Sequence, residues 1–226
     1  MSLAVAIIPS NQIANVSNVP GYGAYNEHEK MHWLAGRLAQ DCQIRGVTAK
    51  AFPVRPETEP GQTYDHQWIV EEVLRANAWL KSVGGGVMVH LHTDSGASSH
   101  NLGIYAGRLW PESRTLTDAL GKRVHELLVT ESYRVLDQAG AIDYNTYIFA
   151  TKAAYTAVLQ ELFSHQNAHD ISTFYQHADR LSATLADGLL AYAGGSTISP
   201  RETALEAEVA RLKALLAQIR ALAGVT

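Results

Sequence analysis

Three consecutive glycines followed by a short apolar run constrain the fold of this chain more than any other stretch. Gly84 to Gly86 precede the segment from Val87 to Ser95, VMVHLHTDS, and β-branched residues after a glycine turn are typical of a buried strand. Side chains alternate between the faces of a strand, so we expect His90 and His92 on one face. The polar residues 93–95 mark the carboxyl end of the strand, where open α/β sheets bind ligands. Two imidazoles there can hold a metal ion; the alternative is a pair of structural, hydrogen-bonded histidines.

Strands and helices alternate along most of the sequence. The pattern predicts strands at 3–8, 47–54, 87–92 and 103–109, an apolar run at 157–163, and helices at 26–46, 68–81, 116–129 and 177–192. The segment 9–25 is rich in Asn, Ser, Pro and Gly, so we expect a loop there. This alternation indicates an α/β fold with a mostly parallel sheet flanked by helices, with an α+β fold as the alternative.

The end of the chain follows a different pattern. A globular domain is expected over residues 1–193, followed by a hinge at 194–199 and an amphipathic helix at 200–226. In that helix the spacing alternates between four and three residues, at Leu205, Val209, Leu212, Leu216, Ile219 and Ala223. Such spacing is the seam of a coiled coil, so we expect homo-oligomerisation, most simply a dimer. The alternative is a helix that packs back onto its own domain.

Composition disfavours several classes of protein. The net charge is −4 with no long Lys/Arg run, which argues against nucleic-acid binding through a basic surface. Cys42 is the only cysteine, so neither an intrachain disulfide nor a cysteine-rich zinc module is possible. No apolar run approaches the roughly 20 residues of a membrane span. No basic residue precedes the apolar segment 1–8, and Pro9 ends this segment too early for a signal peptide. We therefore expect no signal peptide and a cytoplasmic location until release.

Acidic and imidazole side chains stand at the ends of several predicted elements. Glu27 opens the first helix, His92 ends the central strand, and Glu161 lies near the end of the last apolar run. Imidazole and carboxylate can hold a metal ion while a second carboxylate accepts a proton from water. Each residue alone has an ordinary explanation: Glu27 can complement a helix dipole, and Glu161 can be a solvated charge at a strand end.

Four segments carry a family resemblance. They are 26–31 with Ala35, Arg75-Ala76-Asn77 followed by 89–94, 103–105, and 158–163 with Asn167 and Asp170. In this order they resemble the zinc-dependent N-acetylmuramoyl-L-alanine amidase family of the amidase-3 type, found in autolysins and phage endolysins. The resemblance runs from about residue 3 to residue 192. It implies a Zn²⁺ enzyme whose substrate is peptidoglycan.

Carried over position by position, the resemblance implies that Glu27 and His92 are metal ligands and that Glu161 is the catalytic base. The family usually has a third ligand, a histidine, in the turn after the first strand. Here the turn reads Pro-Ser-Asn-Gln over residues 9–12, which puts Gln12 at that position and resembles a branch with a proline-serine-x-glutamine turn. An amide oxygen is a weaker zinc ligand than imidazole.

Other residues can complete or modify this set. His90 shares the strand face of His92, so it is a possible metal ligand or a residue that orients one. His32, one turn into the first helix, is a weaker candidate. Backbone position favours Gln12, directly or through water. Asp94 stands where the family has asparagine and adds negative charge.

The catalytic base has one competitor, Gln160, because Phe163 lies closer to Glu161 than the family spacing requires. Counting instead from Leu159, and forward to Asn167 and Asp170, selects Glu161. The resemblance therefore predicts a cell-wall lytic amidase, most simply a phage or prophage lysin. A wall-binding protein on a catalytically degenerate amidase fold is one alternative, because Gln12 replaces a histidine. A zinc carboxypeptidase-like hydrolase is the other.

Overall fold

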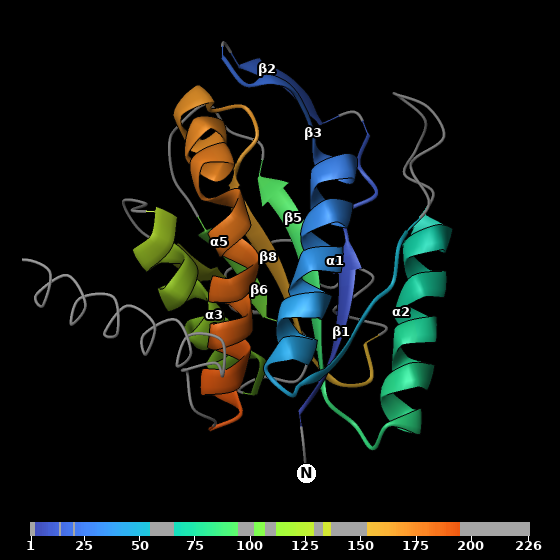
Figure 1. Ribbon diagram of the computed structural model, residues 1–226. Helices are drawn as coiled ribbons and strands as arrows, with labels where there is room; N and C mark the ends of the chain where they lie inside the picture. Colours follow the sequence, from blue (N-terminus) through green and yellow to red (C-terminus); the bar gives the residue numbers. More distant parts are fainter. Residues whose placement is uncertain are drawn as a thin grey trace, which may run out of the picture.

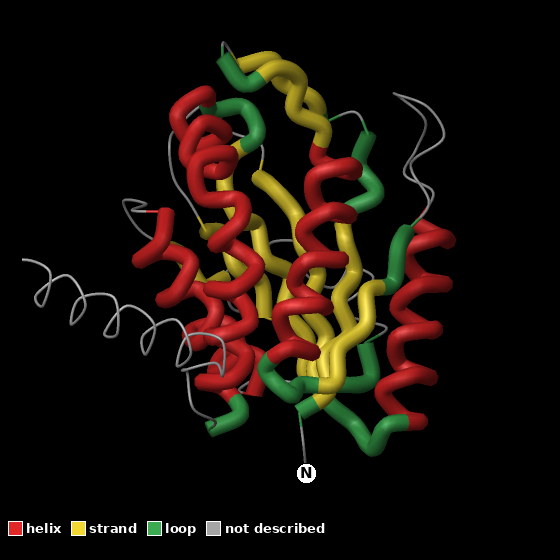
Figure 2. Tube along the Cα trace, viewed as in Figure 1, coloured by secondary structure: helices red, strands yellow, loops and turns green. Residues whose placement is uncertain are grey.

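The computed structural model describes residues 3–13, 15–19, 21–54, 66–94, 102–106, 112–128, 133–136 and 153–194. A six-stranded sheet lies between helices, as Figures 1 and 2 show. Its strand order is β4-β1-β5-β8-β6-β7, and the strands are β1 (Ala4–Pro9), β4 (Thr48–Ala51), β5 (Val87–Asp94), β6 (Leu102–Ala106), β7 (Tyr133–Leu136) and β8 (Thr156–Ser164). The strands β4, β1, β5 and β8 are parallel, whereas β6 runs antiparallel to β8. The predicted α/β fold with a mostly parallel sheet is confirmed.

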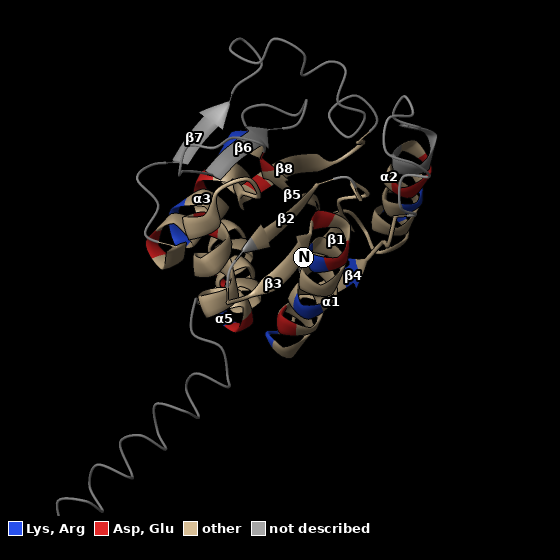
Figure 3. Ribbon diagram, turned by 90° about the horizontal axis from the view of Figure 1, so that it is seen from above, with Lys and Arg blue, Asp and Glu red and all other residues tan. Residues whose placement is uncertain are grey.

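Helices cover both faces of the sheet. Three of them, α1 (Glu27–Ile44), α3 (Glu112–Leu128) and α5 (Ala168–Tyr192), share one apolar cluster that includes Val89 of β5. The helix α2 (His66–Ser82) packs on the opposite face, in a cluster that includes Met88. Seen from above, Lys, Arg, Asp and Glu lie mainly on the helices (Figure 3). None of the described helices is both long and apolar enough to cross a membrane.

The helix α1 forms where the sequence predicts it. Asn26 caps its first turn, because the Asn26 side chain accepts a hydrogen bond from the backbone N–H of Glu29 at 3.1 Å, which satisfies an otherwise unpaired donor. Apolar residues at helical spacing then face the sheet, among them Met31, Leu34 and Leu38. Gly46, with φ of 77°, turns the chain toward β4.

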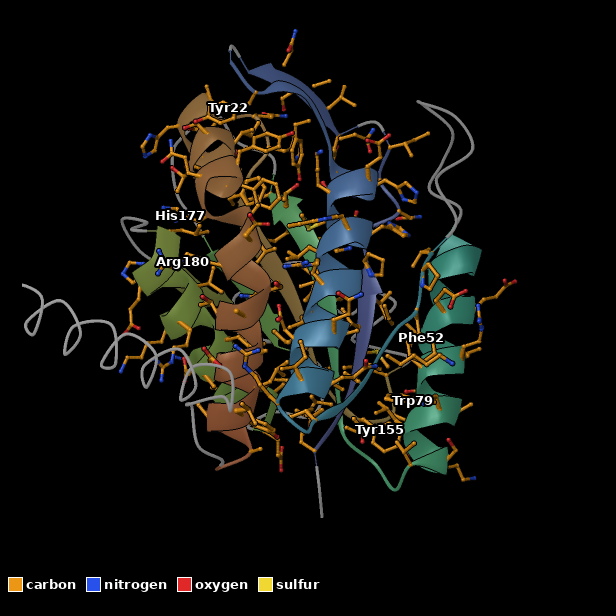
Figure 4. All side chains as sticks on the ribbon, in the orientation of Figure 1. Tyr22, Phe52, Trp79, Tyr155, His177 and Arg180 are labelled. Atoms are coloured by element: carbon orange, nitrogen blue, oxygen red, sulfur yellow. The ribbon has the colours of Figure 1, made fainter. Side chains whose placement is uncertain are left out.

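The segment 9–25, expected to be a loop, contains a hairpin instead. The strands β2 (Val16–Val19) and β3 (Gly23–Asn26) pair antiparallel and stand away from the main sheet (Figure 1). The ring of Tyr22, labelled in Figure 4, stacks on that of Tyr175 in α5 with centroids 5.3 Å apart. Strands this short and polar carry little hydrophobic alternation, so the sequence gives no strand signal.

Two further elements differ from expectation. The helix α5 begins at Ala168, well before residue 177, because Asn167 acts as its cap and accepts hydrogen bonds from the backbone N–H groups of His169 and Asp170. The strand β7 was not predicted. The described part of the chain ends at Gly194, so the rest of the predicted hinge and the helix over 200–226 lie outside the described residues.

Candidate active site

The candidate residues meet where the parallel strands end and α1 begins. In the pairing of β5 with β8, His92 is directly opposite Glu161. Partners in a parallel pair point to the same face, so these two side chains are neighbours. The backbone N–H of Ser10, just after β1, donates to the carbonyl of Leu91 at 2.9 Å. That bond holds the turn containing Gln12 against the end of β5.

The carboxylate of Glu27 lies at the centre of this region and is fully buried. Its Oε1 accepts the backbone N–H of Thr93 at 3.2 Å, and its Oε2 accepts the Thr93 hydroxyl at 2.8 Å. Nδ1 of His92 lies 3.2 Å from Oε1. Burial acts to raise the pKa of Glu27, but its interactions with His92, Ser10 and Asn15 outweigh burial and lower it. The site is therefore organised around an ionised carboxylate.

Gln12 reaches Glu27 through one intervening side chain. Nδ2 of Asn15 donates to Oε1 of Gln12 at 2.6 Å and to Oε2 of Glu27 at 2.7 Å. The amide oxygen of Gln12, its only strong ligand atom, is thus engaged by Asn15. Gln12 lies at the edge of the site and helps to fix Asn15.

Glu161 and His90 are both buried, and their pKa values are shifted in opposite directions. Burial raises the pKa of Glu161 well above its usual range, and the charges of Glu27 and Asp94 raise it further. Burial, followed by the neighbouring His92, lowers the pKa of His90 well below its usual range. The rings of His90 and His92 have centroids 4.5 Å apart. His90 is therefore a neutral imidazole packed against His92.

The structure separates the two candidates for the base. Gln160 pairs with Leu91, one residue out of step with the His92–Glu161 pair. Its strand neighbours at alternate positions, Val158 and Leu162, belong to the core under α1, α3 and α5. Gln160 thus points away from the face that carries His92, and Glu161 points toward it.

His32, the weaker candidate, is directed elsewhere. Its Nδ1 lies 2.7 Å from the carbonyl of His28, and its Nε2 lies 3.0 Å from the carbonyl of Val54. Both ring nitrogens therefore contact backbone oxygens instead of reaching Glu27.

One buried imidazole was missed from the sequence. His165 directly follows β8, and its Nδ1 lies 3.7 Å from Oε2 of Glu27 and 3.3 Å from the Thr93 hydroxyl. The rule that singled out His92, an imidazole at the carboxyl end of a buried strand, would also have found His165. The rule was not applied to His165 because the apolar run was expected to end near Glu161, whereas β8 extends to Ser164.

The donors around Glu27 are of the kinds that bind zinc, and two of their separations are close to those in a zinc site. As the described side chains are placed, no group of three His, Cys, Asp or Glu residues could hold a metal ion. Each oxygen of Glu27, however, has an imidazole Nδ1 beside it, from His92 at 3.2 Å and from His165 at 3.7 Å. Two ligands of a tetrahedral zinc ion are about 3.3–3.6 Å apart, given zinc–ligand bonds of about 2.0–2.2 Å. Binding of the ion would require the side chains of His92 and His165 to move toward one shared position beside Glu27.

No protein-family profile and no curated protein matches this sequence. Several solved structures share its fold. Ami1, an N-acetylmuramyl-L-alanine amidase from Mycobacterium abscessus, superposes with a TM-score of 0.62 at 15% identity, over 85% of this chain and 100% of that one. The catalytic domain of the CD27L endolysin, which targets Clostridia difficile, gives 0.58 at 14% identity, over 83% and 97%.

A third structure is longer than this chain. Cwp6 from Clostridium difficile gives a TM-score of 0.61 at 12% identity over 83% of this chain, which spans 29% of Cwp6. The likeness is one of fold, and the resemblance to N-acetylmuramoyl-L-alanine amidases drawn from the sequence is confirmed at that level.

Proposed function

We propose that this chain is a zinc-dependent amidase that hydrolyses the bond between N-acetylmuramic acid and L-alanine in peptidoglycan. One observation carries the proposal: Glu27, His92 and Glu161 converge at the carboxyl end of the parallel strands. They do so in a fold shared with Ami1, which is named as an N-acetylmuramyl-L-alanine amidase, and with the catalytic domain of an endolysin. Neither the convergence nor the fold alone would support so specific a reaction.

Glu27 and His92 would hold the zinc ion. When bound, zinc polarises the scissile carbonyl and lowers the pKa of a water molecule to about 7. Thr93 and Asn15 fix the orientation of Glu27 through three hydrogen bonds. Such support raises the affinity of a metal ligand by holding it ready for the ion. His90, neutral and packed on His92, limits the rotation of that ring.

Glu161 would act as the base. Its burial raises the pKa of the carboxyl group, so the ionised form is a stronger proton acceptor than an exposed glutamate. Glu161 would take a proton from the attacking water and donate it to the leaving amine of L-alanine. This role requires the face of β8 that it shares with His92.

Digestion of purified cell walls tests the proposal. We expect loss of turbidity, release of stem peptides with a free N-terminal alanine, and inhibition by EDTA. Glu161→Gln should lower the rate by about 10²–10⁴-fold, whereas Glu71→Gln, an exposed change on α2, should leave it unaltered. Release of single amino acids from the stem peptide would instead identify a carboxypeptidase-like hydrolase, and full activity in Glu161→Gln would refute the assigned base.

A wall-binding protein without activity is the second candidate. The engagement of Gln12 by Asn15 favours it, because this turn then offers no strong ligand to a metal. Co-sedimentation with cell walls, in the absence of zinc and of hydrolysis, would support this candidate over the amidase.

Two further predictions concern setting and assembly. The lysin setting implies that the protein acts on the wall only after release from the cytoplasm.

Self-association through residues 200–226, beyond the domain and hinge, is expected to give a dimer. Light scattering on the full chain and on a chain that ends at Gly195 measures this, and a monomeric full chain at micromolar concentration would contradict it.

A further inference from the structure

We propose that His165 is a zinc ligand and completes the set begun by Glu27 and His92. The inference rests on the metal-dependent function proposed above. Glu27 has two carboxylate oxygens, and each faces one imidazole. Nδ1 of His92 lies 3.2 Å from Oε1, and Nδ1 of His165 lies 3.7 Å from Oε2. Glu27 stands at the start of α1, His92 lies in β5 and His165 in the turn after β8. The two imidazoles therefore approach the carboxylate from different elements.

The backbone of His165 is fixed on two sides. Its N–H donates to the carbonyl of Asp94 at 3.0 Å, which ties the turn to the end of β5. Its carbonyl accepts a hydrogen bond from the hydroxyl of Ser17 in the β2–β3 hairpin. The residue is 2% exposed. An imidazole held this firmly loses little conformational freedom when it binds an ion.

The competing explanation is a purely structural hydrogen bond between His165 and Thr93. Their contact is 3.3 Å long. The Thr93 hydroxyl already donates to Glu27 at 2.8 Å, and the hydroxyl of Tyr25 also lies 3.3 Å from it. Thr93 is therefore well satisfied without His165. Nδ1 of His165 and Oε2 of Glu27, 3.7 Å apart, are too distant for a direct hydrogen bond, but their separation is close to that of two ligands of one zinc ion.

Gln12 is the weaker choice for the same place. Its amide oxygen already accepts the hydrogen bond from Asn15 at 2.6 Å, which leaves one lone pair for an ion. Imidazole is also the stronger zinc ligand. Gln12 then acts through Asn15, which holds Oε2 of Glu27 on the side where His165 approaches.

Zinc affinity of the full-length protein, measured by competition with a chromogenic chelator, tests the inference. We expect His165→Ala to weaken binding by more than about 100-fold, above the 10–100-fold loss typical of residues that only orient a ligand. His169→Ala is the matched control, because that exposed histidine lies four residues further along, in the first turn of α5. It should bind zinc like the wild type.

Unchanged affinity in His165→Ala, or a loss confined to His90→Ala, would overturn the inference and leave metal dependence intact. A wild-type chain that binds no zinc would overturn both. Since a buried variant can misfold, X-ray absorption on the wild-type zinc complex gives a second measurement. Two imidazole ligands, retained in His90→Ala, would support the assignment, and a single one in the wild type would overturn it.

Discussion

The two ends of the same sheet bury different kinds of side chain. At the amino ends of β1, β5 and β8, the buried residues are apolar, as at Ala4, Val87 and Ala157. At the carboxyl ends of the same strands, Ser10, Thr93 and His165 are equally buried. The amino end is closed by packing, and Trp79 and Tyr155, labelled in Figure 4, both pack against the apolar cluster there. The carboxyl end is closed by hydrogen bonds that converge on Glu27.

This difference shows how one sheet can separate stability from chemistry. Buried polar groups are costly unless they find partners. The hairpin β2–β3, the start of α1 and the turn after β8 supply partners at one end only. Substitutions at the amino end should therefore lower stability and spare activity, whereas those at the carboxyl end should lower zinc affinity and activity at a smaller cost in stability.

The largest effect on stability is expected from Gly86→Ala at the amino end. Gly86 has φ of 152°, and a Cβ atom there would overlap the carbonyl oxygen of Ala4 and crowd the side chain of Leu80. The start of β5 would have to move away from β1, at a cost of about 3 kcal/mol or more. Urea unfolding monitored by circular dichroism measures the loss.

The control is Gly84→Ala, two residues earlier. Gly84 also has a positive φ, 92°, but nothing lies within 4 Å of its added Cβ. We expect Gly84→Ala to lower the free energy of unfolding by only about 1–2 kcal/mol, which is the penalty of the left-handed conformation. Equal losses in the two variants would mean that close packing does not close this end of the sheet.

At the carboxyl end, Thr93→Val should be milder. Valine keeps the shape of threonine and removes the hydroxyl that donates to Glu27 at 2.8 Å. The free energy of unfolding should fall by about 2 kcal/mol, which is typical of a hydrogen bond to a buried charge. Zinc affinity should be lowered as well. Thr93→Ser retains the hydroxyl and should recover the zinc affinity. If valine has no effect on either quantity, hydrogen bonds do not organise this end.

The sequence predicted the sheet more fully than the site. Glycines, β-branched runs and helical spacing are local signals, so β1, α1, α2 and β5 were found near their true limits. The contacts that complete the site are not local: Asn15 reaches Glu27 across a hairpin with no strand signal, and His165 reaches it from the turn after β8. A sequence pattern cannot show which of several histidines faces a carboxylate, because that depends on strand register.

A smaller effect is expected from Glu161→Gln in metal-free protein. The pKa of Glu161 is raised in the folded state, mainly by burial, so the protonated form is favoured on folding. Its stabilising contribution is complete below the unfolded value of about 4.3 and is lost as the pH rises through the folded pKa. Glutamine, always neutral, should raise the melting temperature by a few degrees at about pH 7 and by almost nothing near pH 4.

Thermal unfolding in EDTA over this pH range provides the measurement, with Glu71→Gln as the exposed control on α2. A glutamine variant that melts below the wild type at every pH would mean that the Glu161 carboxylate stabilises the fold. The carboxyl end would then gain stability from the very residue assigned to chemistry, against the separation drawn above.

The smallest effect concerns Cys42, which lies near the opposite end of α1 from Glu27. Its side chain is fully buried, and burial raises the pKa of the thiol to about 12 despite the nearby Arg45. A raised folded pKa means that its contribution to stability is complete below about 8.5 and is lost as the pH rises toward the folded value. The native thiol should therefore react with an aromatic disulfide at about pH 8 only through opening of the fold, at least about 10³-fold more slowly than in denatured protein.

Cys42→Ala should leave hydrolysis unchanged, because α1 contributes to the site through its first turn alone. Rapid labelling of native protein would show that this end of the molecule opens readily, and that packing closes it less firmly than hydrogen bonds close the other.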